Sequence, residues 1–218
     1  DSIKNKEINA KCLDNIGNVY LSQGLYSKGL TFFYNALEFE RELNLKADMA
    51  ATLSNIGVCL SYLGKYDKAL IYYKEAYSID SILNDPSSIA TDLNNIGYLY
   101  TKWGRIDKAL KYYNLALEMD MKSGNKLNIA HQHRAIGTEY IKLKQYKNAL
   151  LNIKKALKFY QQSGNKGDIA FTYTSLGNLY IELDSLDKAM DYFNMANDYF
   201  LKLNIKHGIA YINHCYGN

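Results

Sequence analysis

The sequence has very little proline, since Pro86 is the single copy among 218 residues. It also lacks Ser/Gly-rich stretches and low-complexity tracts, so nothing in it is typical of a disordered linker. No apolar run approaches the ~20 residues that a membrane helix needs, and residues 1–20 lack the apolar block of a signal peptide. We expect a continuously folded chain without membrane insertion and a cytoplasmic location, with an extracytoplasmic sensor region as the alternative.

Cysteine is scarce, and signals for catalysis are poor. Cys12, Cys59 and Cys215 form no close pair of the kind that marks a zinc site or a redox dithiol, so we interpret them as buried free thiols. His131 and His133 lie about 200° apart around a helix and cannot share a metal ion. No phosphate-binding glycine loop or local catalytic set is present. We expect a protein that is not an enzyme and has no cofactor or metal.

Charge gives little reason to expect a nucleic-acid partner, because the formal net charge is only +4. The charges are unevenly spread: residues 141–160 hold six lysines and no acid, whereas residues 182–200 hold five acids and one lysine. A solvated outer surface explains most of them. An acidic partner segment near Arg134 and Lys142 is the sharper alternative.

What the sequence has is a repeat with a period of 40 residues. Glycines recur at this step at Gly17, Gly57, Gly97, Gly137, Gly177 and Gly217, and alanines at Ala36, Ala76, Ala116, Ala156 and Ala196. Such arrays present a long surface rather than one central pocket. Function is therefore to be sought in binding.

Each repeat holds two stretches with helical spacing. In the first repeat these are Leu13, Ile16, Gly17 and Tyr20, then Leu30, Phe33, Ala36 and Leu37. The predicted fold is all-α, a solenoid of antiparallel helix pairs. One continuous array over 1–218 divides into repeats 1–44, 45–84, 85–124, 125–164 and 165–204, with 205–218 beginning a sixth repeat.

The repeated glycine lies in mid-helix, where it costs roughly 1 kcal/mol relative to alanine. We expect the missing side chain to allow a close approach of small residues 12 and 19 positions later, such as Gly29 and Ala36. Turns are predicted at Gly24, Gly64 and Gly104, and between repeats at Asn44, Asn84, Gly124, Gly164 and Asn204. Asp85 is the predicted N-cap of a helix that begins with Pro86.

The pattern Leu13-x-x-Ile16-Gly17-x-x-Tyr20, Gly29, Phe33, Ala36 resembles the tetratricopeptide repeat and recurs over nearly the whole chain. The family's usual repeat is ~34 residues and often has a proline near its end. The longer period here resembles the long-helix subclass seen in peptide-sensing bacterial regulators, kinesin light chains and Pins-like scaffolds. The resemblance implies a right-handed superhelix whose first helices line a concave groove.

The side of each first helix opposite its core residues is the predicted binding surface for a protein or peptide segment. Beside it, Asn15, Asn55 and Asn95 form a predicted ladder of amides for an extended backbone; the alternative is that these amides only satisfy neighbouring helices or turns. The predicted groove residues are Asp14, Asn15, Asn18, Asn55, Tyr62, Asn94, Asn95, Tyr98, Lys102, His131, Arg134, Thr138, Lys142, Thr174 and Asn178.

The last repeat stops just after Gly217, with Ile209, Ile212 and Tyr216 on one apolar face. We expect further sequence to follow, carrying an effector part, and an end-to-end homodimer through this face stays open. The function predicted from the sequence is a protein-interaction or peptide-binding module, a scaffold or sensor within a larger bacterial regulatory protein. A structural spacer without a groove ligand and a regulator that closes on a small peptide are the alternatives.

Overall fold

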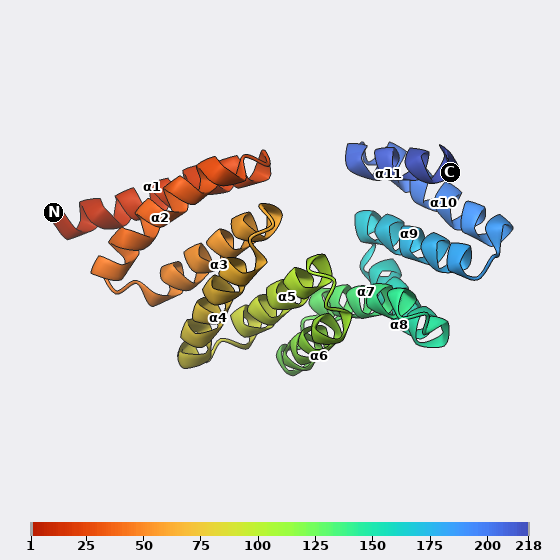
Figure 1. Ribbon diagram of the computed structural model, residues 1–218, viewed down its shortest axis with the longest axis horizontal. Helices are drawn as coiled ribbons and strands as arrows, with labels where there is room; N and C mark the ends of the chain where they lie inside the picture. The colour runs from red at the N-terminus through yellow and green to blue at the C-terminus, as the bar shows by residue number, and fades with distance from the viewer. Residues whose placement is uncertain (1, 218) are drawn as a thin grey trace. The chain divides into compact units, whose positions relative to one another are not determined.

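The computed structural model describes residues 2–217, without the side chains of Ser2 and Tyr216. Within this range the chain forms helices and no strands, as the sequence predicts (Figure 1). The helices are α1 (Ser2–Ser22), α2 (Tyr26–Glu42), α3 (Lys46–Tyr62), α4 (Tyr66–Leu83), α5 (Pro86–Lys102), α6 (Ile106–Ser123), α7 (Lys126–Lys142), α8 (Tyr146–Ser163), α9 (Lys166–Glu182), α10 (Leu186–Lys202) and α11 (Lys206–Gly217).

The helices end where the chain turns into the left-handed backbone region. All eight predicted turn residues have positive φ, between 52° and 73°. Lys144 (φ 58°) and Asp184 (φ 51°) occupy the same conformation without being glycine or asparagine, so the sequence did not reveal them. The Asp85 carboxylate accepts a hydrogen bond from the Ser87 amide at 3.0 Å, which confirms the predicted cap before Pro86.

The helices belong to two compact units, residues 1–119 and 120–218. In the first unit α1 packs against α2 and α3 against α4, and further contacts join α2 to α3, α4 to α5, α1 to α3 and α3 to α5. In the second unit each helix from α7 to α10 contacts the helix that follows it. Contacts between neighbouring helices are what a helical repeat requires to bury its apolar residues.

Large side chains fill the space left by the repeated glycines. A Cβ added at Gly17 would lie 2.6 Å from the Phe33 ring, and one added at Gly57 would lie 2.7 Å from the Tyr73 ring. The predicted partners are therefore partly wrong. Gly29 does approach the Gly17 carbonyl, but the side chain that needs the room stands 16 residues after the glycine, because it fills the helix interface.

The last helix turns its apolar side chains inward, which corrects the prediction of an open apolar face. Ile212 is fully buried and Ile209 half-buried in the core of the second unit, where a Cβ on Gly208 would meet the Phe200 ring. The Tyr216 side chain lies outside the described residues. The part of the face that is described is thus used within the chain, and an end-to-end homodimer stays a prediction.

Two smaller expectations concern thiols and membranes. Cys59 is buried as predicted and Cys215 partly so, whereas Cys12 is exposed, so the prediction of a buried thiol is wrong for Cys12. Among residues 2–217, no helix combines the length and apolar character required to cross a membrane.

Candidate functional site

Polar side chains of α1 and α3 form a connected network. Asp14 accepts a hydrogen bond from the Asn18 amide at 2.8 Å and from the Thr52 hydroxyl at 3.3 Å. The Asn55 amide donates to Asn18 Oδ1 at 3.2 Å and to Asp14 Oδ1 at 3.5 Å. Burial raises the pKa of Asp14, and these hydrogen bonds act against that rise. The sequence thus predicted residues that the structure does bring together.

The three asparagines of the predicted ladder have different surroundings. Asn15 is exposed and Asn95 is half-buried. The Asn55 amide nitrogen is directed at α1, as the alternative interpretation expected. For Asn55 a role in joining two helices is therefore established, and a ladder that binds a peptide backbone stays a prediction.

An aromatic and basic cluster lies at the ends of α3 and α5. The Lys102 ammonium lies 5.3 Å from the centre of the Tyr98 ring and 5.8 Å from that of Tyr62. Tyr62 also stacks on Tyr26 at a centroid distance of 4.7 Å. Tyr62 is 48% and Tyr98 36% exposed. Open rings beside an ammonium group provide flat, amphipathic contact area of the kind found in binding surfaces.

Buried polar pairs between consecutive repeats are a feature that the sequence analysis missed. The Thr52 hydroxyl donates to Glu40 at 2.9 Å, and the Gln132 amide donates to Asp120 at 3.2 Å. Both pairs are 12 residues apart, and the two pairs are related by twice the repeat period. Aligning the repeats could have revealed these acids. Glu40 and Asp120 occupy the position in the repeat that Tyr160 and Phe200 fill later in the chain, where both rings are buried.

In the repeat between these two pairs, both equivalent positions carry carboxyl groups, Asp80 and Asp92. Asp92 is 2% exposed, accepts a hydrogen bond from the Ser54 hydroxyl at 2.7 Å, and has a pKa raised to about 7, mainly by burial. Burial also raises the pKa of Asp80. Burial raises the pKa of Glu40 to about 7. Glu40 and Asp92 are therefore held where their proton occupancy changes near neutral pH.

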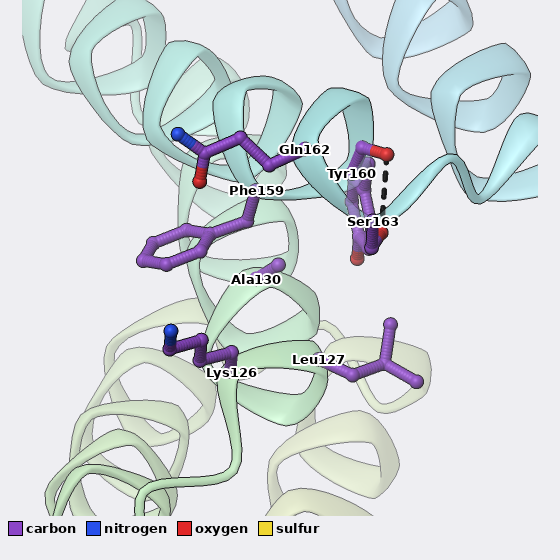
Figure 2. A pocket seen from close by; sticks show the side chains of 7 residues that line it. All are labelled: Lys126, Leu127, Ala130, Phe159, Tyr160, Gln162 and Ser163. Carbon is purple, nitrogen blue, oxygen red and sulfur yellow. Dashed lines mark hydrogen bonds between the residues drawn. The ribbon is translucent and has the colours of Figure 1, made fainter.

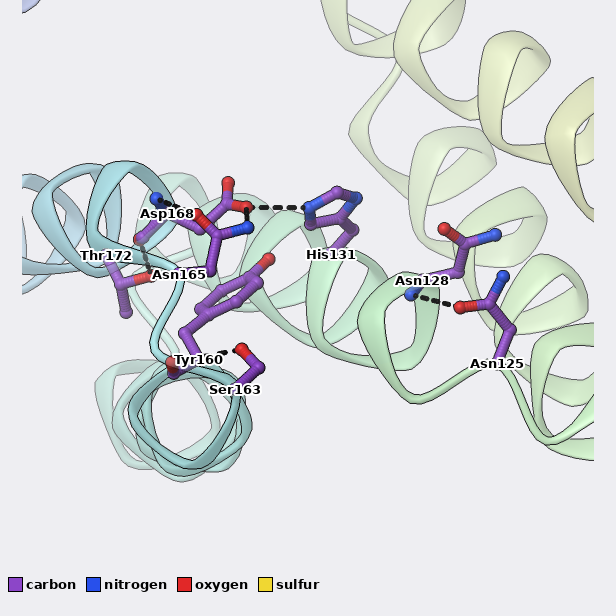
Figure 3. A network of polar contacts seen from close by, with 8 residues as sticks. All are labelled: Asn125, Asn128, His131, Tyr160, Ser163, Asn165, Asp168 and Thr172. Carbon is purple, nitrogen blue, oxygen red and sulfur yellow. Dashed lines mark hydrogen bonds and ion pairs between the residues drawn. The ribbon is translucent and has the colours of Figure 1, made fainter.

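In the second unit the predicted residue His131 belongs to a polar network (Figure 3). Its Nε2 lies 3.2 Å from Asp168 Oδ2, and the Asn165 amide donates to the same oxygen at 2.7 Å. The hydrogen bond with His131 is the main reason why the pKa of Asp168 is lowered. The Tyr160 ring lies next to His131, and burial raises the pKa of its hydroxyl to about 12.

The other predicted residues of this unit are already engaged in the chain. Thr138 donates to the Arg134 carbonyl at 3.0 Å, and exposed Lys142 pairs with Glu139 at 2.8 Å. Asn178 exchanges hydrogen bonds with the Tyr211 hydroxyl at 2.9 and 3.1 Å. Thr174 does not lie on an open surface as predicted: it is 9% exposed and bonds to a carbonyl of its own helix.

The two histidines of α7 have separate partners. His133 lies 2.9 Å from Asn152 Oδ1, whereas His131 contacts Asp168. Burial lowers the pKa of His133. Among residues 2–217, no group of three or more His, Cys, Asp or Glu side chains could hold a metal ion.

A cavity of about 200 Å³ lies between the start of α7 and the end of α8 (Figure 2). It is lined by Lys126, Leu127, Ala130, Phe159, Tyr160, Gln162 and Ser163. Figure 2 shows the ends of Lys126, Phe159 and Gln162 on one side of it. The lining combines apolar area with a single cation and does not assemble a catalytic set.

Comparison with known proteins establishes the family. The sequence matches the tetratricopeptide repeat over residues 9–82 and 48–122, and matches a second description of this repeat over residues 172–198. The first two ranges together span residues 9–122, which is more than half of the chain. The protein therefore belongs to the tetratricopeptide repeat family. A comparison with curated proteins gives no significant match.

Solved structures share the fold at low sequence identity. BtubC (BKLC) from P. vanneervenii has a TM-score of 0.76 at 20% identity, over 91% of this chain and 82% of that one. A Rap protein complexed with competence and sporulation factor has a TM-score of 0.73 at 16% identity, over 98% and 63%. A signal transduction ATPase with a tetratricopeptide repeat sensor from Pyrococcus horikoshii has a TM-score of 0.79 at 21% identity, over 92% and 31%.

Proposed function

We propose that this chain is a protein-interaction module that holds an extended segment of a partner on the surface of its odd-numbered helices. The observation that carries the proposal is the cluster of Tyr62, Tyr98 and Lys102, where two exposed rings and an ammonium from consecutive repeats lie together. Such a surface binds a partner segment through ring contacts and charge, and it does not react with the segment. The role is binding, not catalysis.

The context we propose is the sensor or scaffold part of a larger bacterial regulatory protein. The similar structures include a Rap protein solved with a signalling factor and a sensor region of a signal transduction ATPase. These names support a regulatory setting for the fold, and the partner of this chain is to be found by experiment.

A peptide library immobilised on a surface tests the proposal. We expect the labelled chain to bind a subset of peptides and to lose most of that binding when Tyr62, Tyr98 and Lys102 are replaced by alanine. A matched triple variant replaces exposed Tyr34, Ile71 and Lys74 of the even-numbered helices, and we expect it to bind as the unchanged protein does.

Equal binding by both triple variants would contradict a site at this cluster. Absence of binding to any peptide would contradict the interaction module and favour a structural spacer. Measuring helicity by circular dichroism before the screen ensures that all three proteins are compared in the folded state.

A further inference from the structure

Two cavities in the first unit repeat one arrangement in consecutive repeats. The first, of about 260 Å³, is lined by Asp14, Glu40 and Asp48 among others. The second, of about 220 Å³, is lined by Asp80, Asp85 and Asp92 among others. We call these the first and second acidic pockets. Glu40 and Asp80 are equivalent positions 40 residues apart, so the pockets are products of the repeat.

Each pocket presents more negative charge than the chain neutralises. Lys11 is the basic residue that lines the first pocket, and it is paired with Glu7 at 2.7 Å. No basic residue lines the second pocket within the described part of the chain. The hydroxyl groups of Thr52 and Ser54 donate to Glu40 and Asp92, respectively.

One oxygen of each buried acid is left without an amide, hydroxyl or cationic donor. Glu40 and Asp92 are both 2% exposed. Glu40 Oε2 has no hydrogen-bond partner, and beyond the Ser54 hydroxyl the partner of Asp92 is the neighbouring carboxyl group of Asp80. A buried carboxyl oxygen without a donor is unfavourable, so its presence at the wall of a pocket in two consecutive repeats points to a donor that arrives from outside.

The chemistry of that donor follows from size and charge. Residues 2–217 contain no group of side chains that could hold a metal ion, and the pockets are much larger than such an ion. Lysine and arginine side chains bring several N–H donors and a positive charge on a slender stem. We propose that the two acidic pockets receive two lysine or arginine side chains of one partner segment, an inference that rests on the function proposed above.

The spacing of the pockets restricts the segment. Helices α1 and α3 contact each other, as do α3 and α5, and packed helices lie roughly 8–10 Å apart. A polyproline II segment rises about 9 Å over three residues and returns its side chains to the same side. The segment that fits therefore carries basic residues three positions apart.

The affinity of the pockets for a cation should depend on pH. In the first pocket burial raises the pKa of Glu40 to about 7, and the neighbouring charges of Asp14 and Asp48 add to this rise. In the second pocket burial does the same for Asp92, with Asp80 next to it. A bound ammonium favours the ionised carboxyls, so binding releases protons and weakens as the pH falls below about 7.

The probe is a fluorescein-labelled proline-rich peptide with two lysines three positions apart, measured by fluorescence anisotropy. The matched peptides have glutamine for both lysines, or lysines two positions apart. The test protein carries Glu40→Gln and Asp92→Asn, which keep the side-chain shape, and the control carries Glu38→Gln and Glu118→Gln, which remove two exposed charges. We expect a rise in Kd of about tenfold or more for the test protein and little change for the control.

Measuring peptide affinity at a second pH distinguishes direct binding by the acids from an indirect effect of the substitutions on the fold. With the unchanged protein we expect the lysine peptide to bind more weakly at pH 5.5 than at pH 8, and the test protein to lose this difference. Equal affinity of test and control proteins, or of lysine and glutamine peptides, overturns the proposal. If the library yields only peptides without basic residues, the acidic pockets fail while the interaction module stands; if it yields none, both fail.

Discussion

The Tyr113 ring occupies the space that a side chain at Gly97 would need. A Cβ at position 97 would lie 2.8 Å from two ring carbons. We expect Gly97→Leu to lower the free energy of unfolding by roughly 1–3 kcal/mol or more, because overpacking displaces the ring or the helix. Thermal unfolding measures this, and the double variant with Tyr113→Ala should recover part of the loss. An unchanged melting temperature for Gly97→Leu would contradict the contact.

Lys144 has a backbone conformation that favours glycine. Its φ of 58° is matched by 73° at Gly104, the equivalent position one repeat earlier. Because left-handed backbone is unfavourable for a residue with a Cβ, we expect Lys144→Gly to stabilise the fold by about 1 kcal/mol. Lys154→Gly, at an exposed position in the middle of the adjoining helix α8, is the matched control and should destabilise by about 1 kcal/mol. Denaturant unfolding gives both values, and the same sign for both would refute the explanation.

At the scale of the helix pair, the sequence predicted what depends on local spacing. Gly57 and its apolar neighbours indicate a helix, and Gly64 indicates where that helix ends. Both signals depend on residues that are close together in the sequence. The contact of Tyr73 with Gly57 was missed, since it depends on how two helices cross. Glu40 and Asp92 were also missed, because a single acid within a helix looks like a surface residue until the packing places it inside.

Proton uptake by Glu40 ties the stability of the α2–α3 interface to pH. Its pKa is raised from the ordinary 4.5 to about 7 by burial. Between these values the folded chain retains a proton that the unfolded chain has lost, so raising the pH favours unfolding across that window. The difference corresponds to roughly 3 kcal/mol at most.

Glu40→Gln tests this dependence because it keeps the shape and removes the proton. We expect the stability of the variant relative to the unchanged protein to rise between pH 5 and pH 8, and the exposed Glu38→Gln to show no such trend. Urea unfolding at both pH values measures it. A relative stability of Glu40→Gln that is the same at pH 5 and pH 8 would show that Glu40 is not protonated in the fold.

At the scale of the whole molecule, stability should be distributed rather than shared by one core. Contacts join neighbouring helices, such as α2 with α3 and α8 with α9, and the chain divides into units 1–119 and 120–218. In such an array a destabilising substitution first increases the local unfolding of its own repeat. The sequence predicted the repeat from which this follows, but not the division into units, because the glycine period runs unbroken across residue 119.

Hydrogen exchange can locate the effect of one overpacked glycine in each unit. We expect Gly177→Leu, which would press on Phe193, to reduce the protection of amides in α9 and α10 while α1 to α4 keep theirs. The matched variant Gly57→Leu, which would press on Tyr73, should give the reverse pattern, with loss in α3 and α4 and retention in α9 and α10. Equal loss of protection along the whole chain in both variants would mean that the repeats open as one cooperative body, and the distributed stability inferred from the contacts would be wrong.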